Sequence, residues 1–199
     1  SSRTIMTKYI FDFDDVLFFN TEKFKKHMYK CFDDVGIPYE VVKRYYKIDR
    51  DKGFVLANLV RSVVDGERLQ SVTAPELIEQ IMGACKTFVN QTLLDRIKQL
   101  PVENCYMVTH GVHEYQLEKI NRTGIKHLFA GISIIQDTKK GSVEAICEKF
   151  KDDTVVFIDD KEKRFADLDF KKYPKLKTVL YVGPESIDKI FKYEKDGRD

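Results

Sequence analysis

The chain has 199 residues, of which 43% are hydrophobic and 33% are charged, and its formal net charge is +2. This length suits one large domain or a domain that carries an insertion, and the small net charge excludes a strong general attraction to nucleic acid or an anionic membrane. Four separate cysteines without Cys-x-x-Cys spacing, no visible signal peptide and no apolar run of membrane-spanning length predict a reduced, cytoplasmic protein.

The first predicted element is a buried strand at residues 8–13, where aromatic and β-branched residues form a short apolar run. The run is apolar on both faces, as in a parallel sheet that is covered by helices. Acidic residues interrupt it at its C-terminal end. Asp12 and Asp14 are two positions apart, so their side chains point to the same side and can converge where the strand ends.

Only helices are predicted from residue 20 to residue 98. Apolar residues recur at helical spacing in five segments, near residues 21–35, 41–48, 54–64, 74–88 and 93–97. Asn20 or Thr21 is expected to cap the first of these helices. Thr73 and Glu76 have the spacing of a capping box at the start of the fourth.

The pattern changes at Pro101, after which apolar runs alternate with helical segments. Strands are predicted at residues 105–109, 132–135, 154–158 and 178–182, and helices are predicted before Gly124, from Ser142, near 165–168 and after Pro184. This alternation implies a parallel sheet, which the first strand joins. We therefore predict an α/β fold in which residues 1–19 and 99–199 form a Rossmann-like core flanked by helices, and residues 20–98 form an inserted all-helical segment.

Polar side chains stand at the ends of the predicted strands or at the start of a helix, namely Asp12 with Asp14, Thr109, Lys139 with Lys140, and Asp159 with Asp160. In open parallel sheets, ligands bind outside the carboxyl ends of the strands, so these groups can meet at one site. Buried carboxylates are costly without a cation, and Mg²⁺ prefers carboxylate and phosphate oxygens. The set suits phosphoryl transfer, with a carboxylate nucleophile, a metal ion, a hydroxyl donor and a fixed ammonium charge.

The sequence resembles the haloacid dehalogenase superfamily of phosphohydrolases in this ordered set. Asp12-Phe-Asp14-Asp-Val16 is similar to that family's first motif, Asp-x-Asp-x-(Thr/Val). Thr109 is similar to the second motif and Lys140, before Gly-Ser, to the third. Asp159-Asp160 is similar to the acidic fourth motif. The resemblance covers nearly the whole chain, and it implies that the helical segment 20–98 is a cap inserted between the first and second motifs.

The resemblance implies a role for each of these residues. Asp12 would be the nucleophile, and Asp14 would be the general acid and then the general base. Mg²⁺ would be held by Asp12, the backbone carbonyl of Asp14, and Asp159 or Asp160. Thr109, His110, Gly111 and Lys140 would lie beside the substrate, although His110 is more easily read as peripheral. The expected activity is Mg²⁺-dependent hydrolysis of a small phosphorylated metabolite through an aspartyl phosphate.

Two departures from the family pattern and several alternatives stay open. Asp15 stands where the family commonly has Gly, and the adjacent Lys139 competes with Lys140 for the third motif. A phosphomutase or a nucleotide phosphatase would use the same residues. A non-enzymatic phosphoacceptor or scaffold is a further alternative, and hydrolytic dehalogenation is disfavoured because it needs neither Asp14 nor a metal.

Overall fold

The chain divides into two compact units in the computed structural model, which describes residues 4–194. Unit 1 contains the N-terminal segment through Phe18, Asn90–His110, and the chain from Ile125 onward. Unit 2 contains Phe19–Val89 and Gly111–Gly124. The sequence predicted a helical segment at residues 20–98. The first piece of unit 2 ends at Val89, nine residues before that boundary, and the second piece was not part of the predicted segment.

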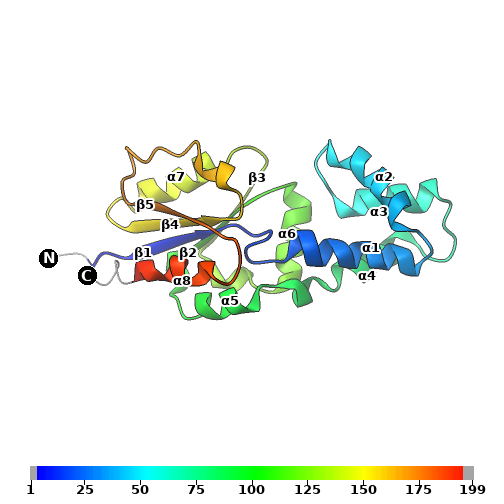
Figure 1. Ribbon diagram of the computed structural model, residues 1–199, viewed down its shortest axis with the longest axis horizontal. Helices are drawn as coiled ribbons and strands as arrows, with labels where there is room; N and C mark the ends of the chain where they lie inside the picture. Colours follow the sequence, from blue (N-terminus) through cyan, green and yellow to red (C-terminus); the bar gives the residue numbers. More distant parts are fainter. Residues whose placement is uncertain (1–3, 195–199) are drawn as a thin grey trace. The chain divides into compact units, whose positions relative to one another are not determined.

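Unit 1 is built on a parallel sheet, as the alternating pattern predicted. The strands follow the order β3-β2-β1-β4-β5, and every neighbouring pair is parallel (Figure 1). Their bounds are Thr7–Phe11 for β1, Cys105–His110 for β2, Gly131–Ile135 for β3, Thr154–Asp159 for β4 and Leu176–Leu180 for β5. The central strand β1 and its neighbour β4 are buried along their whole length.

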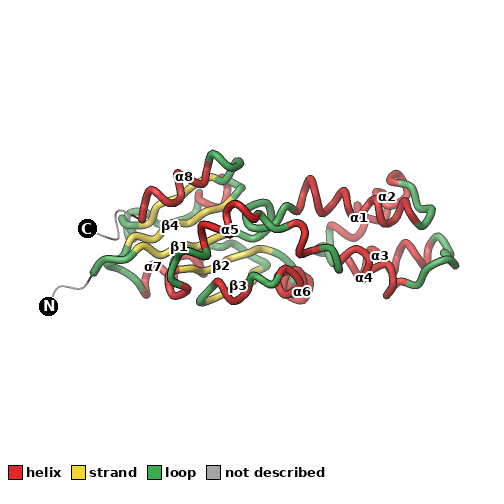
Figure 2. The backbone as a smooth tube through the Cα atoms, turned by 90° about the horizontal axis from the view of Figure 1, so that it is seen from below, coloured by secondary structure: helices red, strands yellow, loops and turns green. Residues whose placement is uncertain are grey.

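Helices cover both faces of this sheet, which explains the apolar character of β1. Helix α7 lies on one face, and α5 and α8 lie on the other (Figures 1 and 2). These helices span Lys140–Lys149 for α7, Gln91–Ile97 for α5 and Ser186–Phe191 for α8. Short 3₁₀ turns complete the unit at Val102–Asn104, Lys126–Leu128, Glu162–Phe165 and Lys192–Glu194.

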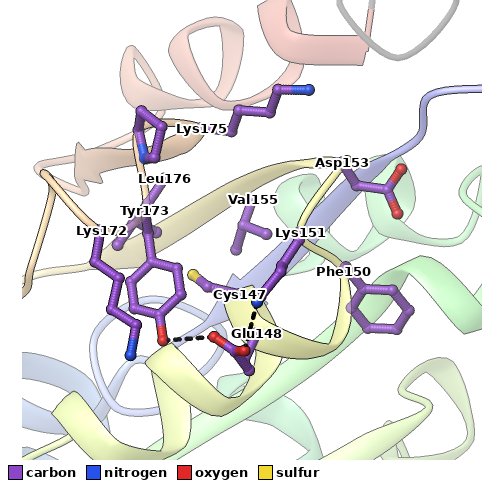
Figure 3. Close-up of a pocket in the computed structure, with 11 residues that line it drawn as sticks. Cys147, Glu148, Phe150, Lys151, Asp153, Val155, Lys172, Tyr173, Lys175 and Leu176 are labelled. Atoms are coloured by element: carbon purple, nitrogen blue, oxygen red, sulfur yellow. Dashed lines mark hydrogen bonds and ion pairs between the residues drawn. The ribbon is translucent and has the colours of Figure 1, made fainter.

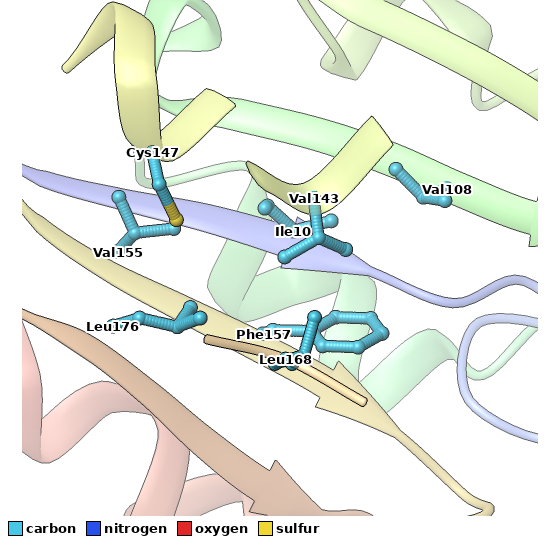
Figure 4. Packing of buried hydrophobic residues seen from close by; sticks show 8 residues of the cluster. All are labelled: Ile10, Val108, Val143, Cys147, Val155, Phe157, Leu168 and Leu176. Carbon is cyan, nitrogen blue, oxygen red and sulfur yellow. The ribbon is translucent and has the colours of Figure 1, made fainter. Parts of the chain in front are cut away.

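The residues of β1 alternate between these two helical layers. The Tyr9 ring packs 5.7 Å from the Phe191 ring of α8, between centroids. Ile10 points the other way and packs with Val143 and Cys147 of α7 (Figure 4). Helix α7 is also joined to the segment before β5, because the Tyr173 hydroxyl donates a hydrogen bond to Glu148 Oε2 at 2.9 Å (Figure 3).

The regular elements of unit 2 are all helical, as predicted for this part of the chain. They are η1 (Asn20–Phe24), α1 (Lys25–Asp34), α2 (Tyr39–Arg50), α3 (Leu56–Gly66), α4 (Ala74–Met82), η2 (Cys85–Phe88) and α6 (His113–Thr123). Helix α6 is tied to α4 by the Arg122 guanidinium, which donates to Glu79 at 2.9 and 2.7 Å. This fork is one contact of residues 111–124 within unit 2, where α6 also packs against η2.

Several helix starts test the predicted caps. Thr73 caps α4 as expected, since its Oγ1 accepts from Glu76 N at 3.3 Å and donates to the Glu76 carboxylate at 2.9 Å. The predicted cap at Asn20 or Thr21 is wrong, because the segment begins with a turn of π-helix that has no side-chain cap. The predicted cap at Ser142 is also wrong. Helix α7 begins at Lys140, whose backbone N–H donates to Thr138 Oγ1 at 3.1 Å.

Strand β5 lies two residues earlier than the predicted 178–182, because its pairing with β4 sets its ends. Val155 pairs with Leu176, and Asp159 pairs with Leu180. Within residues 4–194, no helix is long and apolar enough to cross a membrane.

Candidate active site

The register of the sheet places the ends of its central strands side by side. Phe11, the last residue of β1, is paired with Ile158 of β4, so the next residues, Asp12 and Asp159, stand at the same level. The backbone N–H of Asp12 donates to the carbonyl of Ile158 at 3.0 Å, which extends the ladder by one bond. The predicted meeting of the first and fourth acidic segments therefore follows directly from strand pairing.

A tight turn follows Asp12 and is closed on one carbonyl group. The Phe13 carbonyl accepts hydrogen bonds from the backbone N–H groups of Val16, Leu17 and Phe18 at 3.3, 2.9 and 3.1 Å. The N–H of Asp15 donates to the carbonyl of Phe18 at 2.7 Å. The chain thus reverses within a few residues, which keeps Asp14 and Asp15 near the end of β1.

Asp15 occupies a left-handed position in this turn, with φ of 63°. Glycine reaches such a conformation without strain, and Asp and Asn tolerate it better than other residues do. The backbone geometry explains why an Asp can stand where the family pattern commonly has Gly.

We expect Asp15→Val to lower the free energy of unfolding by about 2 kcal/mol, because a β-branched side chain is strained at a left-handed position. Asp15→Gly and Asp15→Asn should each change it by less than about 1 kcal/mol. Urea unfolding of the three variants measures this. Equal stabilities for the Val and Asn variants would show that the turn does not hold the left-handed conformation.

Asn90 supports the turn from the adjoining part of unit 1. Its side-chain Nδ2 donates to the carbonyl of Val16 and to the hydroxyl oxygen of Tyr181, both at 2.8 Å, and its backbone N–H donates to the carbonyl of Leu17 at 2.8 Å. Its Oδ1 accepts from Leu93 N at 3.4 Å and so caps α5. One buried amide thereby fixes the turn to a helix start and to the residue after β5.

Three carboxylates converge where β1 and β4 end. Asp12, Asp159 and Asp160 each offer an oxygen, and these oxygens lie within 4.8 Å of one another. Asp12 and Asp159 are 6% and 1% exposed, and Asp160 is half-buried. Such crowding of like charges in a buried place is unfavourable unless a cation balances it.

Lys139 supplies one balancing charge from the residue before α7. Its Nζ donates to Asp12 Oδ1 at 2.8 Å and to Asp159 Oδ2 at 2.6 Å, and its side chain is 1% exposed. Asp12 Oδ1 also accepts from the backbone N–H of Phe13 at 2.8 Å. Both of these bonds reach the same oxygen of Asp12, which orients the carboxyl group.

The choice of Lys140 as the site lysine is corrected by this geometry. The Lys140 ammonium donates to Glu144 Oε2 at 2.7 Å and to the carbonyl of Asp167 at 2.9 Å, and its side chain is 41% exposed. Successive residues at a helix start point about 100° apart, so only one of two adjacent lysines can reach the carboxylates. That residue is Lys139.

The ionisation of the cluster reflects burial and mutual repulsion. Burial raises the pKa of Asp12 well above its ordinary value, the Lys139 ammonium opposes this shift, and the Asp159 carboxylate reinforces it. Burial also raises the pKa of Asp160; its contact with Asp12 lowers this pKa, and the charges of Asp159 and Asp15 raise it. The raised pKa values of Asp12 and Asp160 mean that full ionisation of the three carboxylates is unfavourable here unless a further cation balances their charge.

The residues of this cluster fit a Mg²⁺ ion. Mg²⁺ binds oxygen ligands at 2.0–2.1 Å, so two ligands of one ion lie at most about 4.2 Å apart. The three carboxylate oxygens all lie within 4.8 Å of one another, so small side-chain movements bring them within this span. Three carboxylates against one ammonium leave a formal surplus of two negative charges, which matches a divalent cation. Asp12, Asp159 and Asp160 are the side chains that would hold it.

Two other predicted residues, Thr109 near the end of β2 and Asp14 after the end of β1, are not among the three clustered carboxylates. Thr109 is 1% exposed near the end of β2, one residue beyond the level of Asp12 in the register. Asp14 is half-buried in the turn, and its carboxylate is not part of the three-carboxylate group. Its backbone carbonyl as a metal ligand stays a prediction.

His110 and Gly111, which were predicted to lie beside the substrate, follow Thr109 in the chain. His110 is exposed at the end of β2, and its Nε2 lies 3.1 Å from the carbonyl of Gln136. Burial of its ring lowers the pKa of His110, and the Arg164 charge adds to the effect. Gly111 belongs to unit 2, where a side chain would meet Gln116 at 2.6 Å.

One contact in the site has no signal in the side-chain pattern. The backbone N–H of Lys161 donates to Asp159 Oδ1 at 2.9 Å, just after β4. Every residue except proline has a backbone N–H group, so the identity of residue 161 does not reveal this hydrogen bond. Only a prediction of the turn that follows β4 could have indicated it.

Comparison with known proteins bears on the fold. No protein-family model matches the sequence, and no curated protein matches it. Solved structures do match. A haloacid dehalogenase-like hydrolase from Burkholderia xenovorans LB400 aligns with a TM-score of 0.61 at 16% identity, covering 98% of this chain and 90% of the other.

Two further structures agree with this likeness. A protein from Thermotoga maritima named as a β-phosphoglucomutase aligns with a TM-score of 0.58 at 13% identity, covering 96% of this chain and 99% of the other. A hydrolase from Streptococcus pneumoniae TIGR4 aligns with a TM-score of 0.56 at 14% identity, covering 96% and 100%. At such low identities, these likenesses establish the fold.

Proposed function

We propose that this chain, which has the fold of haloacid dehalogenase-like hydrolases, is a Mg²⁺-dependent phosphatase that hydrolyses a small phosphomonoester through an aspartyl phosphate. The observation that carries the proposal is the cluster of Asp12, Asp159 and Asp160, in which Lys139 Nζ contacts the buried carboxylates of Asp12 and Asp159. A structural role alone would not require three carboxylates so close together. Helical unit 2 would correspond to the cap that the resemblance implies.

Asp12 is the proposed nucleophile. Its Oδ1 is held by Phe13 N and Lys139 Nζ, both at 2.8 Å, so we assign the attack to its second oxygen, Oδ2. Attack on phosphorus forms the Asp12 acyl phosphate and breaks the bond between phosphorus and the leaving oxygen. Lys139 provides a fixed positive charge beside the developing negative charge. Bound at the carboxylates, Mg²⁺ would offset the repulsion between the anionic nucleophile and the anionic phosphate.

Asp14 is the proposed acid and base, by its place two residues after the nucleophile. It would donate a proton to the leaving oxygen in the first step. In the second step it would accept a proton from water, whose oxygen attacks phosphorus. Inorganic phosphate then leaves, and the Asp12 carboxylate is regenerated. Thr109 is assigned as a hydroxyl donor to a phosphoryl oxygen.

We expect hydrolysis of an aryl phosphate to require Mg²⁺ and to fall to background when the ion is chelated, because the carboxylates would then repel the phosphate. Phosphate release from a panel of phosphorylated metabolites, with and without Mg²⁺, measures this and reports substrate choice. Full activity in chelator would contradict the metal assignment. Phosphorylation of Asp12 without phosphate release would indicate a phosphoacceptor instead.

A phosphomutase is the second candidate, since the Thermotoga maritima neighbour is named as a β-phosphoglucomutase. Its reaction would use the same aspartyl phosphate but return the phosphoryl group to another hydroxyl of the substrate. Incubation with sugar phosphates separates the two activities: an isomeric phosphate indicates a mutase, and inorganic phosphate indicates a phosphatase.

A further inference from the structure

A cavity lies in unit 1 between α7, the start of β4 and the segment that leads into β5 (Figure 3). Its volume is about 190 Å³. Val155, the second residue of β4, and Leu176, the first residue of β5, line it, whereas Asp159 ends β4. At a strand rise of about 3.3 Å per residue, the four residues from Val155 to Asp159 span about 13 Å. A ligand in this cavity would not touch the carboxylate cluster.

The inner wall of the cavity is apolar. Cys147, Val155 and Leu176 contribute to it and are 3%, 2% and 4% exposed. Burial raises the pKa of the Cys147 thiol to about 12, so the thiol is neutral and behaves as a small apolar group. An apolar cavity of about 150 Å³ can admit benzene, so this one has room for a six-carbon ring.

The mouth of the cavity already holds a carboxylate. Glu148 Oε2 accepts from the Tyr173 hydroxyl at 2.9 Å, and Glu148 Oε1 accepts from Lys151 Nζ at 2.8 Å (Figure 3). Lys172 Nζ lies 5.5 Å from the centre of the Tyr173 ring. Among residues 4–194, the Lys172 ammonium has no carboxylate within ion-pair distance, although its charge, after that of Lys151, helps to lower the pKa of Glu148. Two ammonium groups therefore face one carboxylate at the mouth, which leaves a net positive charge there for an outside anion.

The outer wall is fixed by local hydrogen bonds. Lys172 N donates to Asp169 Oδ1 and Tyr173 N donates to the Asp169 carbonyl, both at 3.0 Å. Leu176 N donates to the Tyr173 carbonyl at 3.1 Å. Lys175 Nζ donates to the carbonyl of Asp152 at 2.8 Å. These bonds hold the wall in place, as in pockets that are formed before the ligand arrives.

We propose that this cavity binds a small carboxylate that carries an apolar body. The body lies against Cys147 and Val155, and the carboxylate lies at the mouth beside Lys151 and Lys172. Lysine supplies three of the charged side chains that line the cavity and Glu148 and Asp153 supply two, so an anion is favoured over a cation of the same size. This site is independent of the proposed phosphatase activity.

The test uses benzoate as the probe and benzamide as its neutral counterpart, added to the ¹⁵N-labelled chain and followed by NMR. We expect saturable shifts of the Cys147, Val155 and Leu176 amides with a low-millimolar dissociation constant for benzoate, and at least about fivefold weaker binding of benzamide. Lys172→Gln should weaken benzoate binding about fivefold, whereas Lys189→Gln on α8 should leave it unchanged. Glu148→Gln should strengthen it, because that variant removes the competing carboxylate.

Three results would overturn the proposal. They are the absence of saturable shifts at the cavity amides, equal affinity for benzoate and benzamide, and equal affinity of the Lys172→Gln and Lys189→Gln variants for benzoate. Each measurement is made on the folded chain. A variant that fails to give the wild-type spectrum elsewhere is replaced by Lys151→Gln, for which the same weakening is expected.

Discussion

Asp12→Asn is expected to lower kcat for phosphate-ester hydrolysis by at least about 10⁴-fold, because a neutral amide cannot form the acyl phosphate. The side chains have nearly the same shape, so the packing of Asp12, which is 6% exposed, should be preserved. The substitution also removes one of three crowded carboxylates, and we expect the free energy of unfolding to change by no more than about 1 kcal/mol. Steady-state kinetics with an aryl phosphate and urea unfolding measure the two effects.

Asp153→Asn is the matched control for this experiment. Asp153 is also buried, at 1% exposed, and Asp153 Oδ1 accepts from Met6 N at 3.0 Å. It directly precedes β4, whereas Asp159 ends that strand. The control should keep kcat within about twofold of wild type and lose about 1 kcal/mol of stability, since it weakens the hydrogen bond from Met6 N to a charged group. Retained turnover in Asp12→Asn would end the assignment of the nucleophile.

Lys139→Met is expected to have the second-largest effect. Removal of the ammonium takes away the charge that contacts Asp12 and Asp159 at 2.8 and 2.6 Å. We expect kcat to fall about 10²- to 10³-fold. The two buried carboxylates lose their cation, so the free energy of unfolding should fall by about 3–5 kcal/mol in the absence of Mg²⁺. Thermal and urea unfolding with and without Mg²⁺, together with kinetics, measure this.

Lys140→Met tests the neighbouring lysine in the same background. Its ammonium contacts Glu144 and the carbonyl of Asp167 on an exposed part of α7, so both activity and stability should remain near those of wild type. Lys139→Met and Lys140→Met change adjacent residues, yet only Lys139→Met is expected to lower kcat strongly. Loss of activity in Lys140→Met with retention in Lys139→Met would reverse the geometric assignment.

The sequence predicted the fold well because the sheet depends on strong local signals. Apolar runs between helical segments mark each strand, and strand pairing then brings Asp12 and Asp159 to one level, as the carboxyl-end rule implies. The ends of β5 could not be predicted, because its partner β4 determines them: Asp159 pairs with Leu180, and the apolar run continues past that point.

The sequence predicted that Asp12 meets Asp159 and Asp160, but for the site lysine it favoured Lys140 and kept Lys139 as the alternative. Composition does not distinguish Lys139 from Lys140; only the starting point of α7 decides which of them faces inward. Helix α7 starts at Lys140 without a side-chain cap, and Lys140 N donates to the Thr138 hydroxyl at 3.1 Å. The N-cap position is Lys139 and not the predicted Ser142, a difference of three residues, and the lysine at this position is the one that contacts the carboxylates.

The salt bridges of Lys139 bear on whether the protein can fold before it binds a metal ion. Because an internal ammonium already neutralises part of the buried negative charge, unit 1 can reach its native structure before any ion arrives. Folding and metal loading are then separable, unlike in small zinc domains that collapse only around their metal. A preparation stripped of divalent ions should keep its cooperative unfolding transition, and its activity should return on simple addition of magnesium without a refolding step.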